Sequence, residues 1–162
     1  MQIRPYIPAY AVKVKNMLKS HVDYAPETTD SACHDNILFF EDTFVENNEG
    51  LNAYVVHDEK DEIISFMVVH QKIISKKVLL YIIALFVAKK ETASQYALNS
   101  VCLFQNMLDD STRLAININP QNEEIVTFWQ TNGFDYKPEI SLFVNADNER
   151  LCAYENISAK MQ

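Results

Sequence analysis

The stretch Asn122-Glu-Glu-Ile-Val-Thr-Phe-Trp-Gln-Thr-Asn-Gly-Phe134 decides the fold that we assign to this chain. It predicts a short helix, because Asn122 is a residue type that caps helix N-termini well. Gly133 suits the left-handed residue that often follows a helix. Phe128 and Trp129 form an aromatic pair near the middle of the segment. Taken alone, such a pair is found more often in a hydrophobic core than against a cofactor.

Strands and helices alternate on both sides of this segment. Upstream, Leu114–Ile118 reads as a strand, and Thr92–Leu108 reads as a helix because apolar residues recur there every three or four positions. Val78–Ala88 is apolar throughout, which predicts a strand in the middle of a sheet with both faces covered. Downstream, Ile140–Asn145 and Leu151–Ile157 read as the last two strands.

The chain up to Gln71 supplies two more predicted helices and three more predicted strands. Together the elements follow the order β-α-α-β-β-β-α-β-α-β-β, without repeats or linkers, so we predict one domain over residues 1–162. Its predicted class is α+β, with a central, mostly antiparallel sheet of about seven strands flanked by about four helices. The N-terminal elements are a strand at Ile3–Tyr6, a helix from Pro8 to about Val22, a helix from Asp30 or Ser31 to about Val45 closed by Gly50, and a hairpin of Leu51–His57 with Glu62–Gln71.

Composition excludes several classes of protein. The chain has 162 residues, of which 48% are apolar and 22% charged, with a net charge of −8, as in ordinary water-soluble domains. No apolar run approaches the ~18 residues that span a bilayer, and the N-terminus carries no secretion signal. We therefore expect a cytoplasmic protein without a membrane partner. The acidic balance also argues against a nucleic-acid partner.

The cysteines, histidines and glycines exclude other kinds of site. Cys33, Cys102 and Cys152 lie far apart, so we expect reduced thiols rather than a disulfide or metal site. The histidines are scattered and form no metal signature. Gly50 and Gly133 are the only glycines, which excludes the nucleotide-binding loops of the Walker and Rossmann kinds.

The segment from Asn122 to Phe134 resembles the C-terminal signature of Gcn5-related N-acetyltransferases. In that family an Asn opens the helix, an aromatic pair lies near its middle, and Gly-Phe begins the next strand. The predicted order of elements is also that of the family, so the resemblance covers nearly the whole chain. It implies transfer of an acetyl group from acetyl-coenzyme A (acetyl-CoA) to a primary amine of a small molecule or protein.

The resemblance also implies where acetyl-CoA binds. In the family it lies between the fourth and fifth strands, which must separate here where Val87 and Ile118 end. Backbone groups at the end of the fourth strand bond the pantetheine amides, and the following turn and helix N-terminus hold the pyrophosphate. The implied cofactor-binding residues are Leu85, Phe86 and Val87 on the strand, Thr92, Ala93, Ser94, Gln95, Tyr96 and Ala97 on the turn, and Asn122 and Trp129 on the later helix.

Two features depart from the family pattern. The pyrophosphate turn is usually rich in glycine, but Thr92–Ala97 contains none. Gln95 takes one of the small positions, where its amide would either obstruct the diphosphate or donate a hydrogen bond to it. Lys89 and Lys90 are close enough in sequence to supply positive charge. Trp129 stands where the family commonly has a Tyr that protonates the departing thiolate, and an indole N–H cannot do this.

The sequence assigns no catalytic acid or base. Tyr81, Tyr96 and Tyr136 are left open as acids, and Glu62 and His70 as bases. Three functions therefore remain: an acetyltransferase that works mainly by positioning its substrates, a catalytically inactive relative that keeps the fold as a binding or dimer-forming module, and an unrelated α+β regulatory domain. The acceptor amine and the oligomeric state, a homodimer included, stay undetermined.

Overall fold

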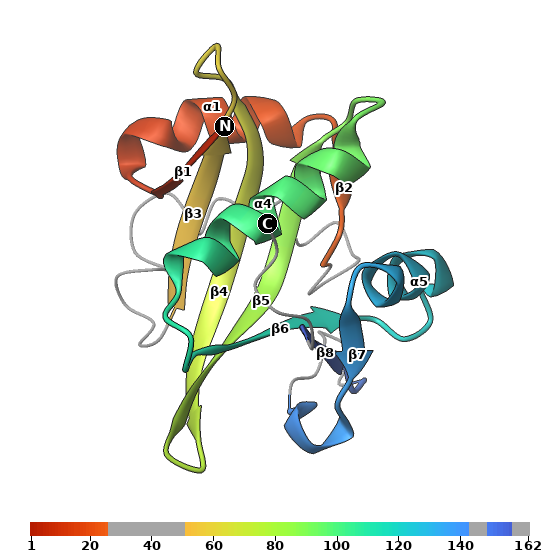
Figure 1. Ribbon diagram of the computed structural model, residues 1–162. Coiled ribbons are helices and arrows are strands. Elements are labelled where there is room, and N and C mark those ends of the chain that lie inside the picture. The colour runs from red at the N-terminus through yellow and green to blue at the C-terminus, as the bar shows by residue number, and fades with distance from the viewer. Residues whose placement is uncertain (26–50, 143–148, 157–162) are drawn as a thin grey trace.

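The computed structural model describes residues 1–25, 51–142 and 149–156. In these ranges the chain forms one mixed sheet of eight strands, mostly antiparallel, with three α-helices. The predicted α+β class and the mostly antiparallel central sheet are confirmed. The helix predicted to begin at Asp30 or Ser31, and Gly50 at its end, lie outside the described residues. Figure 1 shows α4 lying across the front of β4 and β5.

The sheet has the strand order β1-β3-β4-β5-β6-β8-β7, and β2 pairs with β5 off this path. The strands are β1 (Gln2–Pro5), β2 (His21–Asp23), β3 (Leu51–His57), β4 (Ile63–Ile74), β5 (Lys77–Ala88), β6 (Arg113–Ile118), β7 (Phe134–Tyr136) and β8 (Cys152–Asn156). The α-helices are α1 (Ala11–Leu18), α4 (Ala93–Met107) and α5 (Glu123–Thr131), and two 3-10 helices span Pro8–Tyr10 and Pro138–Ile140.

The strand β5 is shared between two hydrophobic cores. Because side chains alternate between the two faces of a strand, Phe86 faces a core that contains α1, whereas Leu85 and Val87 face a second core that contains residues of α4 and α5. Every residue from Tyr81 to Ala88 is buried. This confirms the prediction that the long apolar strand lies inside the sheet with both faces covered.

The prediction of a helix running to about Val22 is wrong at its end. The helix α1 ends at Leu18, and residues 21–23 form β2. The side chain of Val22 packs against the second core, so it fitted a helical stripe in the sequence while belonging to a strand. Pairing with β5 supplies hydrogen bonds to the β2 backbone, and this long-range gain outweighs the local pattern.

The strand predicted at Ile140–Asn145 is also placed differently. Ile140 lies in the second 3-10 helix, and residues 143–148 lie outside the described ranges. The strand that follows α5 is β7, which begins at Phe134, where the family resemblance placed it. Gly133 has a φ of 93°, a left-handed conformation that favours glycine and turns the chain straight from α5 into β7.

Candidate functional site

The strands β5 and β6 separate as predicted, but the separation begins after Ile82 and Ile116, before the strand ends at Val87 and Ile118 where it was expected. They run parallel and pair from Leu79 with Arg113 to Ile82 with Ile116. Beyond that point β5 continues to Ala88, still paired with β4 on its other edge as far as Val87. At Leu85–Val87 the edge of β5 that faces β6 is therefore not paired with β6, as the predicted site requires.

The strand β2 covers the edge that β6 leaves. Val22 lies opposite Val87 in an antiparallel register. At one end of this pairing the Tyr24 N–H donates to the Leu85 carbonyl at 2.9 Å, and at the other the Lys89 N–H donates to the Ser20 carbonyl at 3.1 Å. Figure 1 shows β2 in the space between β5 and α5. Leu85, Phe86 and Val87 thus have backbone neighbours on both sides.

The helix α5 has the ends that the sequence predicts. The Asn122 side chain accepts a hydrogen bond from the Ile125 N–H at 3.3 Å, which confirms it as the N-cap. Glu123 and Glu124 occupy the first turn, where carboxylates interact favourably with the helix dipole. Phe128 and Trp129 of this helix contact Tyr24, the residue that follows β2.

Trp129 belongs to the second core and joins α5 to β2. Its side chain is completely buried, and its Nε1–H donates to the Tyr24 carbonyl at 2.7 Å. The indole packs edge-on against Phe128 and Phe134, with ring centroids 4.9 and 5.2 Å away, and the Tyr24 ring lies 5.0 Å from Phe128. Trp129 therefore holds β2 in place in this structure.

The predicted pyrophosphate turn leads into α4. Ala93 and Ala97 are buried in the second core and Tyr96 is half-buried, whereas Thr92, Ser94 and Gln95 are exposed. The first turn of α4 carries no acidic residue. The Gln95 side chain donates from Nε2 to Asn99 Oδ1 at 2.9 Å, one turn further along the helix. Its amide is thus engaged on the helix surface.

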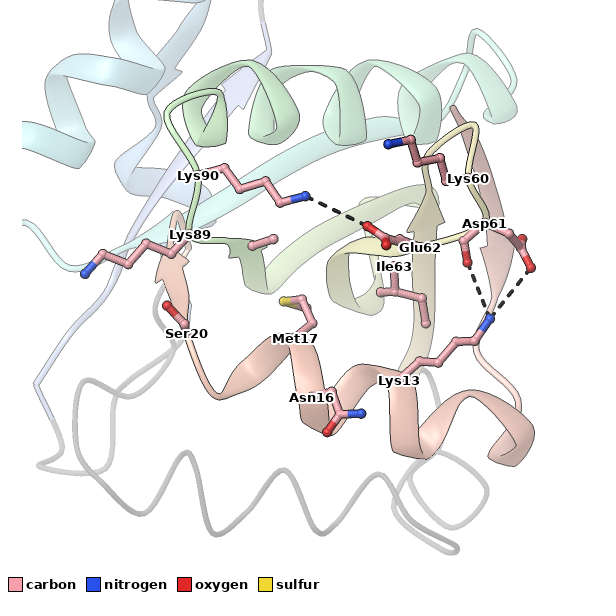
Figure 2. Close-up of a pocket in the computed structure, with 11 residues that line it drawn as sticks. Lys13, Asn16, Met17, Ser20, Lys60, Asp61, Glu62, Ile63, Lys89 and Lys90 are labelled. Carbon is pink, nitrogen blue, oxygen red and sulfur yellow. Dashed lines mark hydrogen bonds and ion pairs between the residues drawn. The ribbon is translucent and has the colours of Figure 1, made fainter.

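Lys89 and Lys90, the lysines predicted to supply positive charge, line a cleft of about 590 Å³ next to the pairing of β2 with β5. Figure 2 shows Lys90 directed toward Glu62, with a distance of 4.0 Å between Lys90 Nζ and Glu62 Oε2. The buried side chains of Met17 and Ile63 contribute apolar surface to the cleft. The residues that line it are Lys13, Asn16, Met17, Ser20, Lys60, Asp61, Glu62, Ile63, Ala88, Lys89 and Lys90.

Of the candidate acids, Tyr81 lies one residue before the last pairing of β5 with β6, and Tyr136 lies on β7. Tyr81 is completely buried, its hydroxyl donates to the Ile140 carbonyl at 2.7 Å, and burial raises its pKa to about 12. Such a pKa makes it a poor proton donor near neutral pH. Tyr136 packs against Tyr154 and is 41% exposed. His70 lies opposite Tyr81, further along β5 from Leu85, and burial lowers its pKa.

A histidine–aspartate pair on β2 was not predicted. His21 Nε2 lies 2.9 Å from Asp23 Oδ1, and His21 Nδ1 lies 2.8 Å from the Leu18 carbonyl. The hydrogen bond to Asp23 raises the pKa of His21 against the opposing effect of burial. The His21 ring packs edge-on against Phe86. Since residues two apart in a strand share a face, the pair would have been recognised had this segment been read as a strand.

Asn117 is a second residue that the sequence reading missed. It lies on β6, one residue beyond the last pairing of β6 with β5, and is 1% exposed. Neither its amide nitrogen nor its amide oxygen has a hydrogen-bond partner, an unfavourable arrangement for a buried polar group. The sequence signal for this site was a polar residue, Asn117, between two apolar residues of a predicted strand, Ile116 and Ile118.

Across residues 1–25, 51–142 and 149–156, no three His, Cys, Asp or Glu side chains come together as a metal site. Within the same ranges no helix is long and apolar enough to cross a bilayer.

No protein-family model matches the sequence, and neither does any curated protein. The fold, however, is similar to solved structures over nearly its whole length. Aminoglycoside 6'-acetyltransferase type Ii is 12% identical, covers 99% of this chain and 100% of its own, and has a TM-score of 0.66. A chimaera of the spermidine N-acetyltransferase SpeG from Vibrio cholerae and hSSAT is 11% identical, with 96% and 94% covered and a TM-score of 0.61.

Arabidopsis thaliana NAA60 in complex with acetyl-CoA is also similar, at 12% identity, with 94% of each chain covered and a TM-score of 0.50. At such identities the similarity is one of fold. The chain therefore has the fold of the Gcn5-related N-acetyltransferases, as its sequence predicts.

Proposed function

We propose that this protein is a cytoplasmic N-acetyltransferase that binds acetyl-CoA between β5 and β6 and transfers the acetyl group to a primary amine. The observation that carries the proposal is the separation of β5 from β6 after Ile82, while β5 stays paired with β4. The amine is that of a small molecule or protein. Two of the similar structures bear the names of acetyltransferases of amine-bearing compounds, and a third was solved with acetyl-CoA.

In this proposal the chain acts mainly by positioning. The backbone of Leu85–Val87 would hold the pantetheine amides, and the exposed N-terminal turn of α4 would receive the diphosphate. A strand-end N–H would polarise the thioester carbonyl while the amine attacks it. The turn fits this role as it stands, because Ser94 and Gln95 are exposed and no carboxylate lies in the first turn. The edge of β5 can bind pantetheine only when β2 is displaced from it.

A second candidate function is a catalytically inactive module that keeps the fold for ligand binding or dimer formation. Trp129 favours it, because the residue at the family's usual Tyr position is completely buried and its N–H is bonded to the Tyr24 carbonyl. Neither candidate includes a nucleic-acid or membrane partner.

Calorimetric titration with acetyl-CoA, followed by an assay of thiol release with a panel of amines, separates the two functions. Binding with amine-dependent thiol release supports the enzyme, and binding without release from any amine supports the module. Absence of binding at millimolar acetyl-CoA, by the parent protein and by a variant with β2 destabilised, would exclude the enzyme and leave the dimer-forming module.

A charge substitution in α4 tests the proposed diphosphate site. Ser94→Glu places a carboxylate in the first turn of α4, where it would repel the diphosphate, and we expect acetyl-CoA affinity to fall at least tenfold. Asn106→Glu adds the same charge at an exposed position near the far end of α4 and serves as the matched control. Equal affinities of the two variants would place the diphosphate elsewhere.

A further inference from the structure

The pairing of β2 with β5 runs over the backbone groups that the proposed function assigns to pantetheine. Hydrogen bonds at Ser20 and at Tyr24 mark the two ends of this pairing. Between them, the three residues of β2 lie opposite three residues of β5: His21 opposite Ala88, Val22 opposite Val87, and Asp23 opposite Phe86. Each backbone amide has one N–H to donate. An N–H of β5 that is bonded to β2 is therefore not available to another extended chain along the same edge.

The pantetheine arm is chemically similar to a short extended peptide, because it carries two amide groups along a flexible chain. Sheet edges commonly bind extended peptides through their main-chain groups. The segment Ser20–Tyr24 already makes this kind of contact in this structure. This segment pairs with the edge of β5 that faces β6, because the other edge of β5 is paired with β4 as far as Val87.

The strand β2 has three residues. Beyond its backbone pairing, its C-terminal side is fixed by the Trp129–Tyr24 hydrogen bond and by the Tyr24 ring against Phe128. Val22 packs in the second core, and the His21 ring packs against Phe86. A strand this short belongs to the part of a fold that opens most readily.

We propose that β2 is a built-in competitor of the cofactor, so that acetyl-CoA binds only to molecules in which Ser20–Tyr24 has left the edge of β5. This inference rests on the proposed function. The apparent affinity for acetyl-CoA is then the intrinsic affinity reduced by the fraction of molecules with an open edge. A change that stabilises the pairing of β2 with β5 should weaken acetyl-CoA binding, and a change that destabilises this pairing should strengthen it.

A reversible crosslink gives the sharpest test. His21 and Ala88 lie directly opposite each other between two hydrogen-bonded pairs, and such positions have Cα atoms about 4.5 Å apart, close enough for a disulfide. In a background with Cys33, Cys102 and Cys152 replaced by serine, His21→Cys/Ala88→Cys should lose at least a hundredfold in acetyl-CoA affinity on oxidation and regain it on reduction. Equal affinities of the oxidised and reduced forms would overturn the proposal.

The control crosslink uses the same chemistry away from β2. Ile73 and Val78 are paired at the β4–β5 hairpin, at the other end of β5. Oxidation of Ile73→Cys/Val78→Cys in the same background should leave acetyl-CoA affinity within about twofold, since β2 stays displaceable.

The opposite variant loosens β2. Val22→Pro removes the N–H of Val22 from the middle of the pairing, and we expect acetyl-CoA affinity to rise about tenfold or more. Val22→Thr keeps the N–H and the branched shape, and should leave affinity within about threefold. An unchanged affinity of Val22→Pro would contradict the proposal.

Hydrogen exchange of the unmodified protein gives a further test that does not depend on whether the variants fold. Saturating acetyl-CoA should speed exchange of the Tyr24 amide, which loses its Leu85 acceptor, while the amides of β5 stay protected by the ligand. Slower exchange at Tyr24 would overturn strand displacement. Binding that obeys these expectations without acetyl transfer would overturn only the proposed enzyme, and absence of binding by every form, Val22→Pro included, would overturn both.

Discussion

The indole of Trp129 lies between two elements that are distant in the sequence. Its hydrogen bond to the Tyr24 carbonyl spans 105 residues, and both groups are buried. A buried carbonyl that loses its donor costs more free energy than the net value of one hydrogen bond. At the scale of single residues, this bond and the contact of the Tyr24 ring with Phe128 join α5 to the end of β2.

Trp129→Phe should lower the free energy of unfolding by about 2–4 kcal/mol, because it leaves the Tyr24 carbonyl without a donor and creates a small cavity. Urea unfolding followed by circular dichroism measures this loss. Phe134→Leu is the matched control, because it reduces ring contacts in the same core and keeps the indole bond. Only Trp129→Phe should also speed exchange of the Tyr24 amide, and a loss below about 0.5 kcal/mol would contradict this role.

Tyr81 is expected to act as a structural residue. Tyr81→Phe removes the hydroxyl that donates to the Ile140 carbonyl, and should cost about 1–2 kcal/mol of stability. In an alkaline absorbance titration the variant should lack the tyrosine with a pKa of about 12. Tyr136→Phe, at an exposed position, should change stability by less than about 0.5 kcal/mol. Equal stabilities of the two variants would argue against the buried hydrogen bond.

At the scale of elements, β2 shows how a short strand escapes local prediction. Its three residues give too few positions to establish alternation, and Val22 continues the apolar stripe of α1 in sequence. The edge of β5, more than 60 residues away, decides its conformation. The same strand brings His21 and Asp23 onto one face, where they form an ion pair.

The His21–Asp23 pair should make stability depend on pH. Because the pKa of His21 is raised in the folded state, its contribution is fully present below the unfolded pKa of ~6.5 and is lost as pH rises through the folded pKa. The stability difference between the parent and His21→Gln should therefore shrink as pH rises above ~6.5. Urea unfolding at a series of pH values below and above ~6.5 measures it.

His70 supplies the control of opposite sign. Burial lowers its pKa in the folded state, so protonation of His70 at acid pH disfavours folding and the penalty disappears as pH rises through ~6.5. The parent should therefore gain stability relative to His70→Gln as pH rises towards ~6.5, and lose stability relative to His21→Gln as pH rises above ~6.5. The same trend for both variants would contradict the pairing of His21 with Asp23.

At the scale of the whole molecule, one strand joins two cores. The side chains of β5 alternate between the core that contains α1 and the core that contains α4 and α5. Neither core can lose β5 without disrupting the other, so the two should unfold together.

The single tryptophan makes this testable. Trp129 reports on the second core by fluorescence, and far-ultraviolet circular dichroism reports on the whole sheet and its helices. We expect the two urea transitions of the parent protein to coincide within error. A fluorescence transition at lower urea would show that the region of α5 and β2 opens as a separate unit.

The predictable parts of the fold are those with local causes. Asn122 and Gly133 act at the ends of α5 through hydrogen bonds and backbone angles within a few residues. The burial of β5 follows from its own apolar run. The end of α1 at Leu18 and the strand at residues 21–23 could not be predicted in this way, because their cause is a distant strand edge.

In the candidate site too, the features with local causes were predictable from the sequence and those with distant causes were not. The sequence by itself determined the class of fold, the central strand and the capped helix, since periodicity and caps are properties of neighbouring residues. Only the tertiary structure decided that β2 lies on Leu85–Val87, that Trp129 is buried against Tyr24, and that Lys90 faces Glu62. Each of these depends on contacts between residues far apart in the chain, which a local pattern does not encode.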